Sequence, residues 1–139
     1  MTSRSSSSRR GRYTQHTKKI MDQAQTELLV IDPYVDEDLL DMFASLNPSV
    51  TIRVLTEHLK GNFRNALRKL QQQRGSIEVR RSSKFHDRFI VVDGAACYQL
   101  GGSINAGAKA TVIGRKSDAM RDSIVKEAED AWSSATPVS

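Results

Sequence analysis

The segment that decides the fold of this chain is His86-Asp87-Arg88-Phe89-Ile90-Val91-Val92-Asp93-Gly94. Its apolar centre, residues 89–92, is rich in β-branched side chains and predicts a buried strand that spans residues 85–92. Asp93-Gly94 is a dipeptide typical of tight hairpin turns, and residues 96–100 follow it with a second strand pattern. The sequence therefore predicts a β-hairpin whose first strand has polar residues at both ends.

The polar residues at the start of this strand are the first candidates for chemistry. His86 and Arg88 are two positions apart, so on a strand both side chains leave the same face. A histidine can attack phosphorus or transfer protons, and an arginine can bind two phosphate oxygens at once. Downstream, Gly101-Gly102-Ser103-Ile104-Asn105 allows close backbone approach and offers hydroxyl and amide groups. This second segment favours an anion site with a nucleophile over a histidine that merely packs in the core.

Strand and helix patterns alternate on both sides of the hairpin. Further strands are predicted at residues 27–31, 50–55, 77–80 and 110–113, and helices at residues 14–25, 36–46, 61–74 and 118–132. In the last helix the expected buried stripe comprises Met120, Ile124, Ala128, Ala131 and Trp132. Strands separated by helices, with one internal hairpin, predict an α/β domain with a mixed β-sheet flanked by helices on both faces.

The charge of the chain is unevenly distributed. The 139 residues have a formal net charge of +5, but residues 1–19 carry +6, residues 20–52 carry −7, residues 53–116 carry +9 and residues 117–139 carry −3. The +9 block contains His86 and Arg88, so the charge pattern favours an anionic partner such as nucleic acid there. The acidic blocks are expected to form surfaces that do not bind it.

The length of the chain fits one domain. Residues 1–13, rich in serine and arginine, are expected to form a disordered basic leader, and a solvated leader is favoured over a nucleic-acid arm. We expect the domain to span residues 14–135 and a disordered tail to span residues 136–139. No apolar run approaches the ~20 residues of a membrane helix, and no apolar segment follows the first arginines as in a secretory signal. These features predict a cytoplasmic protein.

Cysteine and the remaining histidines give no metal pattern. Cys97 is the only cysteine, which excludes an internal disulfide, and we expect it to pack as a small apolar side chain. No two histidines stand at metal-ligand spacing, so neither a metal nor a cofactor is predicted. His16 is expected to be exposed. His58 follows a predicted strand and is expected to be a loop histidine, with a functional group as the alternative.

The two polar segments together resemble the motif of the phospholipase D superfamily, His-x-Lys-x4-Asp followed by Gly-Ser-x-Asn. Matches of the same residue type are His86, Asp93, Gly102, Ser103 and Asn105. Arg88 stands where the family has lysine, and eight residues instead of the usual six separate Asp93 from Gly102. The order of elements between about residues 14 and 132 is also similar to that of the family. The resemblance implies a phospholipase D-like fold.

The resemblance also implies roles for these residues in a metal-independent phosphoryl transfer. His86, Arg88 and Asp93 would be catalytic: His86 would attack the diester and form a phosphohistidine, and Asp93 would support the motif through hydrogen bonds. Arg88 would also hold phosphate oxygens, together with Gly102, Ser103 and Asn105, and water would complete hydrolysis. The family's site uses two motifs. This chain has one, which implies a homodimer in which a second His86 acts as general acid.

Two functions therefore remain open for the same fold. The first is a phosphodiesterase, favoured as a nuclease on DNA or RNA because the motif lies in the +9 block. The second is a catalytically silent module that binds nucleic acid or phosphate, since the planar fork of Arg88 replaces a compact ammonium group. Phospholipid is less favoured as a substrate, because no aromatic-rich apolar loop or basic amphipathic surface helix stands out.

Overall fold

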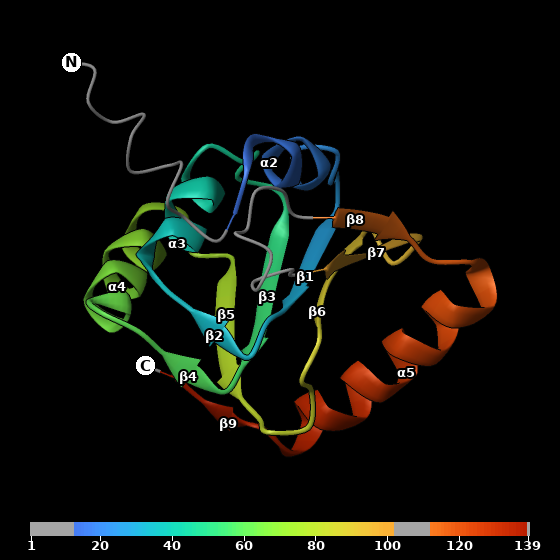
Figure 1. Ribbon diagram of the computed structural model, residues 1–139. Coiled ribbons are helices and arrows are strands. Elements are labelled where there is room, and N and C mark those ends of the chain that lie inside the picture. The colour runs from blue at the N-terminus through green and yellow to red at the C-terminus, as the bar shows by residue number, and fades with distance from the viewer. Residues whose placement is uncertain (1–12, 102–111, 139) are drawn as a thin grey trace.

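A seven-stranded sheet with the order β8-β7-β6-β1-β3-β5-β9 forms the centre of the protein (Figure 1). The computed structural model describes residues 13–101 and 112–138. The parallel strands are β1 (Glu27–Ile31), β3 (Thr51–Thr56) and β5 (Ile77–Arg81). Antiparallel to their neighbours are β6 (Arg88–Val92), β7 (Ala96–Gly101), β8 (Val112–Arg115) and β9 (Thr136–Pro137). The sheet is mixed, as the sequence predicted.

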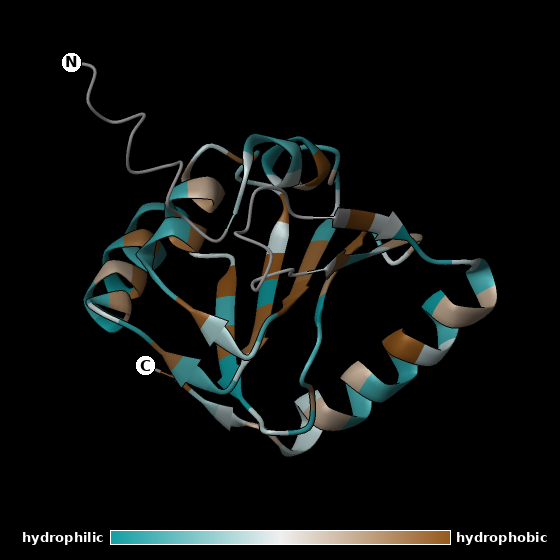
Figure 2. Ribbon diagram, in the orientation of Figure 1, coloured by the Kyte–Doolittle hydropathy of each residue, from teal (hydrophilic) through white to brown (hydrophobic). Residues whose placement is uncertain are grey.

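Helices cover both faces of this sheet. One face packs against α2 (Gln15–Met21), α3 (Glu37–Ala44) and α4 (Phe63–Arg74), and the other packs against α5 (Asp118–Ser134). In β1, Leu28 and Val30 enter the first core, whereas Leu29 and Ile31 enter the second. Because β1 is buried on both faces, its residues 28–31 are continuously apolar, and Figure 2 shows most of this strand in the colour of hydrophobic residues. None of the helices in the described ranges has the length and apolar character required to cross a membrane.

Short polar signals set the limits of several elements. Asp36 begins α3 as predicted, since its side chain accepts a hydrogen bond from the Asp38 amide at 3.0 Å. At the other end of α4, Gly75 adopts a φ of 78°, the left-handed conformation that commonly ends helices. Asp93 and Gly94 have φ angles of 56° and 67°, which form the predicted turn between β6 and β7.

The structure differs from the sequence predictions at several ends of elements. β6 begins at Arg88 instead of residue 85, and α2 ends at Met21 instead of residue 25. On α5 the buried residues are Ile124, Ala128 and Ala131, while Met120 is exposed. Apolar spacing alone could not reveal that Met120, in the first turn of α5, lies beyond the part of the helix that covers the sheet.

Both ends of the described chain extend beyond the predicted domain limits. Tyr13, placed in the leader by its sequence context, is buried. Residues 136–138, predicted as part of a disordered tail, instead pair with β5: the Val138 amide donates to the Val79 carbonyl at 2.9 Å, and the Val138 side chain joins the core. The open edge of β5 offers unpaired backbone groups, which these residues satisfy.

Candidate functional site

Two of the predicted site residues, His86 and Arg88, lie near the edge of the sheet at which the parallel strands end. Asp32 directly follows β1, and the pairing of Ile31 with Phe89 brings Arg88, at the start of antiparallel β6, beside it. His58 and Arg81 lie at the corresponding ends of β3 and β5. We name Asp32, His58, Arg81, His86 and Arg88 the carboxyl edge. In α/β sheets this is the edge at which ligands usually bind.

Arg88 is held at this edge by a buried aspartate. Its Nε donates to Oδ2 of Asp32 at 2.9 Å, and the exposed fractions of the two side chains are 14% and 1%. The hydroxyl of Tyr13 also donates to Asp32 Oδ2, while the Tyr13 ring lies 5.2 Å from the guanidinium carbon. The Tyr34 amide donates to Oδ1 at 3.0 Å. A planar guanidinium can pair with a carboxylate and lie over a ring at once, which accounts physically for arginine at this position.

His86 lies in the loop before β6, so its predicted place on the strand is wrong, and strand geometry no longer determines its orientation relative to Arg88. Its side chain is exposed. The preceding Phe85 packs edge-on against Phe89, with ring centroids 6.3 Å apart and an interplanar angle of 77°. The loop is thus anchored one residue before His86, and the strand begins two residues after it. The histidine is presented to solvent from a short segment fixed at both ends.

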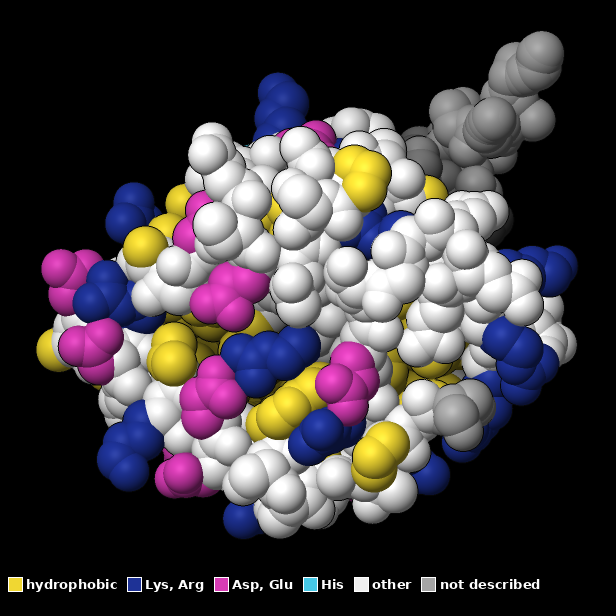
Figure 3. All heavy atoms as spheres, turned by 180° about the vertical axis from the view of Figure 1, so that it is seen from behind, with side chains coloured by type: hydrophobic (Ala, Val, Ile, Leu, Met, Phe, Trp, Pro, Cys, Tyr) yellow, Lys and Arg dark blue, Asp and Glu magenta, His cyan; other side chains and the backbone are white. Residues whose placement is uncertain are grey.

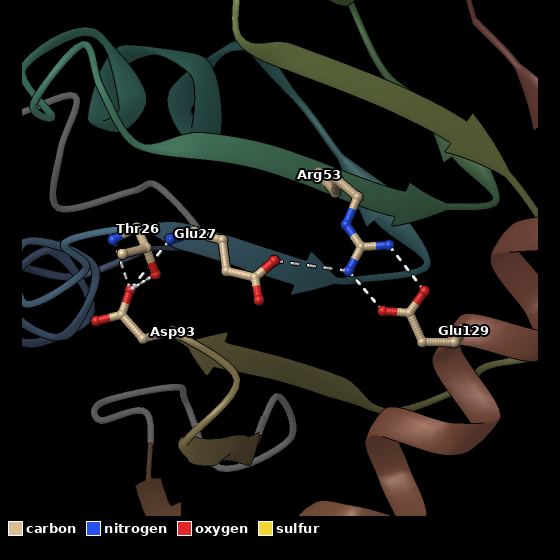
Figure 4. Close-up of polar contacts among 5 residues, drawn as sticks. All are labelled: Thr26, Glu27, Arg53, Asp93 and Glu129. Carbon is tan, nitrogen blue, oxygen red and sulfur yellow. Dashed lines mark hydrogen bonds and ion pairs between the residues drawn. The ribbon is translucent and has the colours of Figure 1, made fainter.

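Asp93 lies at the opposite end of β6, roughly 16 Å along the strand from Arg88. Its carboxylate accepts hydrogen bonds from the backbone amides of Gln25, Thr26 and Glu27 at 2.8–3.2 Å, and from the Thr26 hydroxyl at 2.9 Å. Figure 4 shows the bonds from Thr26 and Glu27. These bonds, led by that of the Thr26 amide, lower the pKa of Asp93 to about 2. Asp93 therefore fastens the hairpin to the start of β1 and is separated from the carboxyl edge.

The second predicted segment, residues 101–105, lies mostly outside the described residues. Gly102, Ser103 and Asn105 are outside the described residues. The described residues on either side, Gly101 and Val112, pair with each other, and the neighbouring Leu100 pairs with Arg88. The chain therefore leaves β7 and enters β8 at the same edge as Arg88.

An aromatic stack adjoins the Arg88 site. The strands β2 (Tyr34–Val35) and β4 (His58–Leu59) pair in parallel, which places the Tyr34 and His58 rings 4.8 Å apart at an interplanar angle of 15°. Lys60 Nζ lies 5.6 Å from the Tyr34 ring centroid, and Glu57 Oε2 lies 3.7 Å from His58 Nε2. His58 is therefore in a short strand at the edge, not in the predicted loop.

Comparison with solved structures identifies the architecture. The structure is similar to Nuc from Salmonella typhimurium, a phospholipase D family member, with a TM-score of 0.60, 15% identity and 86% of each chain covered. The chain has a phospholipase D-like fold. It is also similar to TrmBL2, an archaeal chromatin protein with a novel mode of DNA binding, with a TM-score of 0.62 and 18% identity over 89% of this chain and 50% of that one. No family model and no curated protein sequence matches the chain.

In this phospholipase D-like fold, several cations of the +9 block have structural partners. Arg53 forms a bidentate pair with Glu129 at 2.6 and 3.0 Å, which raises the pKa of Arg53 and lowers that of Glu129. Arg80 donates to Glu78 at 2.8 Å, and Arg74 donates to four backbone carbonyls around the end of α3. In the central and left parts of the face in Figure 3, basic side chains accordingly lie beside acidic ones, whereas those along the right-hand border have no acidic side chain next to them in this view. The net charge counted along the sequence thus overestimates the positive charge that the protein surface presents.

The remaining candidate metal ligands and nucleophiles of the phospholipase D-like domain do not form a second site among the described residues. Among the described residues, no three His, Cys, Asp or Glu side chains come together in a way that could hold a metal ion. Cys97 is buried, which raises the pKa of its thiol to about 11 and makes the reactive thiolate scarce. His16 is exposed on α2, as predicted.

Sequence reasoning missed three residues of the carboxyl edge and its surroundings. Asp32, Tyr13 and Tyr34 were given no role at the site. For Asp32 a signal was present, because a carboxylate directly after a fully apolar strand of an α/β sheet stands where functional groups gather. Tyr13 had no such signal, since its contact with Asp32 joins residues 19 positions apart.

Proposed function

We propose that the protein is a phosphodiesterase that cleaves nucleic acid, with His86 as its nucleophile. The observation that carries this proposal is the exposed His86, two residues before an Arg88 that Asp32 and Tyr13 hold in place, at the carboxyl edge of a phospholipase D-like fold. Nucleic acid is the favoured diester because the structurally similar TrmBL2 binds DNA and this chain is basic overall. Such a substrate is consistent with the cytoplasmic location predicted from the sequence.

The proposed reaction has two steps. A ring nitrogen of His86 attacks the phosphorus, the bond from phosphorus to the leaving oxygen breaks, and that oxygen takes a proton from a second His86. The second histidine then removes a proton from water, which attacks the phosphohistidine and releases the phosphate monoester and the free His86. Because each chain has one such motif, we propose that the second histidine comes from another copy in a homodimer.

Arg88 would stabilise the charge on the phosphate in both steps. The guanidinium group, which donates through Nε to Asp32, is the group proposed to bind phosphate oxygens. Gly102, Ser103 and Asn105 are proposed to complete the phosphate cradle. Asp93, fastened to the start of β1, is proposed to keep β6 in register and not to touch the reacting atoms.

The decisive test is hydrolysis of single- and double-stranded DNA and RNA in EDTA. We expect cleavage by the wild type and a loss of at least about 100-fold in His86→Ala, since a positioned proton-transfer group typically contributes that much. His16→Ala is the matched control, because it removes an exposed histidine from α2 and should retain activity. Equal activity in wild type and His86→Ala, or none in either, contradicts the phosphodiesterase.

The homodimer has its own test. Analytical ultracentrifugation should show a dimer at the concentrations at which cleavage is measured. A stable monomer that still cleaves would remove the composite two-histidine site from the proposal.

The second candidate is a catalytically silent nucleic-acid-binding module. The pairing of Arg88 with Asp32 favours it, since the buried carboxylate offsets the cation that would attract a phosphate. This candidate predicts binding without cleavage and an affinity that falls steeply with salt, with log K decreasing by ~0.9 per neutralised phosphate for each tenfold rise in salt. Salt-independent or undetectable binding would contradict it.

A further inference from the structure

We propose that the carboxyl edge selects single-stranded nucleic acid by stacking a base on the Tyr34–His58 pair. This inference rests on the proposed function, because it names the substrate class of the same site. It does not require that His86 turns the substrate over.

The stack has the properties of a base-binding platform. The two rings are nearly parallel, and 44% of Tyr34 and 45% of the His58 side chain are exposed. Within residues 13–101 and 112–138, the large hydrophobic residues that are exposed are Tyr34 and Met120, and Tyr34 is the one that stacks on a residue of the carboxyl edge. A base can continue the stack on the outer side of the His58 ring, and such stacking tolerates any sequence because every base has a π-face.

The platform is joined firmly to the proposed phosphate site. The Pro33 carbonyl accepts hydrogen bonds from the amides of Glu57 and His58 at 3.2 and 2.7 Å. The Tyr34 amide donates to Asp32, the same carboxylate that holds Arg88. Because β3 and β6 flank β1 on either side, their ends lie roughly 10 Å apart. A short run of nucleotides can therefore place a base at His58 and a phosphate at Arg88.

Cations beside the stack suit the backbone of such a strand. Lys60 approaches the Tyr34 ring, and a shallow hollow next to His58 is lined by Glu57, Arg81, Ser82, Ser83 and Thr136. Arg81 is fixed there by donation from Nε to the Glu57 carbonyl at 3.2 Å. Cationic and hydroxyl groups next to exposed rings form the usual pattern for binding single strands without sequence preference. In a duplex each base is stacked between neighbouring bases, so its faces are covered and it cannot stack on the Tyr34–His58 pair.

Binding measured with matched probes tests the inference. The protein would carry His86→Ala to prevent turnover, and the probes would be a fluorescent oligothymidine of about 12 nucleotides, an abasic strand of equal length and a duplex. Fluorescence anisotropy should show oligothymidine bound roughly 5- to 100-fold more tightly than the abasic strand, which carries the same charge without bases. The duplex should also bind more weakly than oligothymidine.

Variants assign the preference to the platform. Tyr34→Ala and His58→Gln should each reduce the preference for bases, whereas Tyr34→Phe keeps the ring and should retain it. Lys69→Ala, which removes an exposed cation from α4, is the control for a general loss of charge and should retain the base preference. Equal binding of oligothymidine and abasic strand, or a preference for duplex, would overturn the inference, as would a base preference that survives both Tyr34→Ala and His58→Gln.

A separate assay distinguishes failure of the inference from failure of the proposed function. Hydrolysis of bis(p-nitrophenyl) phosphate by the wild-type protein, which retains His86, reports whether a simple diester is cleaved. If this diester is cleaved but oligothymidine and abasic strand bind equally, the phosphodiesterase stands and the stacking platform is wrong. If no diester is cleaved but the base preference follows Tyr34 and His58, the platform stands in a catalytically silent binding module.

Discussion

Asp32 and Asp93 lie at opposite ends of the same pair of strands, β1 and β6, and their environments differ. Asp32 is 1% exposed and binds a guanidinium and a phenol at the carboxyl edge. Asp93 is partly exposed and binds backbone amides at the start of β1, and its partners in Figure 4 are Thr26 and Glu27. The first carboxylate holds a candidate functional side chain, and the second holds the backbone.

Residues that belong to one sequence motif therefore lie in two separate places in the structure. His86, Arg88 and Asp93 lie within eight residues, yet only His86 and Arg88 are near the carboxyl edge. Asp93 can affect chemistry only through the position of β6. Changes at the Asp32 end should therefore alter both stability and phosphate binding, whereas changes at the Asp93 end should alter stability alone.

The largest effect is expected from Asp32→Asn. It leaves Arg88 largely buried without its carboxylate, and breaking such a pair should lower the free energy of unfolding by about 3 kcal/mol. Urea denaturation measures the change. Adding Arg88→Gln should recover part of the loss, because it removes the largely buried charge that had lost the Asp32 carboxylate. A loss below about 1 kcal/mol would indicate that the pair is solvated and weak.

Arg88→Lys should have the next largest effect. Lysine restores the residue type of the phospholipase D motif but loses the planar contact with Tyr13 and the geometry of the Nε bond, at a cost of about 2 kcal/mol. We expect the rate of diester hydrolysis to differ from that of the wild type as well as the free energy of unfolding. Unaltered stability would show that the guanidinium geometry is unimportant.

Asp93→Asn should cost about 1.5 kcal/mol at neutral pH, because hydrogen bonds to a charged acceptor are replaced in a partly exposed place. Folding lowers the Asp93 pKa from 3.8 to about 2, so its ionised form stabilises the fold fully above pH 3.8. That contribution is lost as the pH falls through about 2. The difference between wild type and variant should therefore shrink between pH 4 and pH 2 in urea denaturation, and a constant difference would contradict this account.

Gly94→Ala should have the smallest effect. Gly94 has a φ of 67°, and a Cβ there would lie 3.5 Å from Glu27 Oε2, which is an ordinary contact. The cost is therefore the left-handed backbone alone, about 1 kcal/mol. Thermal unfolding measures it, and diester hydrolysis below the transition should be unchanged. A loss of hydrolysis would show that the two ends of β6 are coupled.

The parts of the fold that the sequence could predict are those that depend on local patterns. The apolar run of residues 28–31 specified β1, Asp36 specified the start of α3, and Asp93-Gly94 specified a turn. Contacts between distant residues could not be obtained this way. The Arg88–Asp32 pair joins residues 56 positions apart, and the pairing of residues 136–138 with β5 depends on an open sheet edge. The start of β6 was placed too early because Phe85 fits a strand pattern but packs from a loop.

The short strand β9 has a consequence for how copies of the chain can meet. It covers the end of β5 at one border of the sheet, and Pro137 contributes no backbone N–H to any further strand. A border that is brief and contains proline discourages the addition of strands from other molecules, which is a common route to aggregation. A homodimer with a shared active site is thus not expected to form by continuing the sheet past β9.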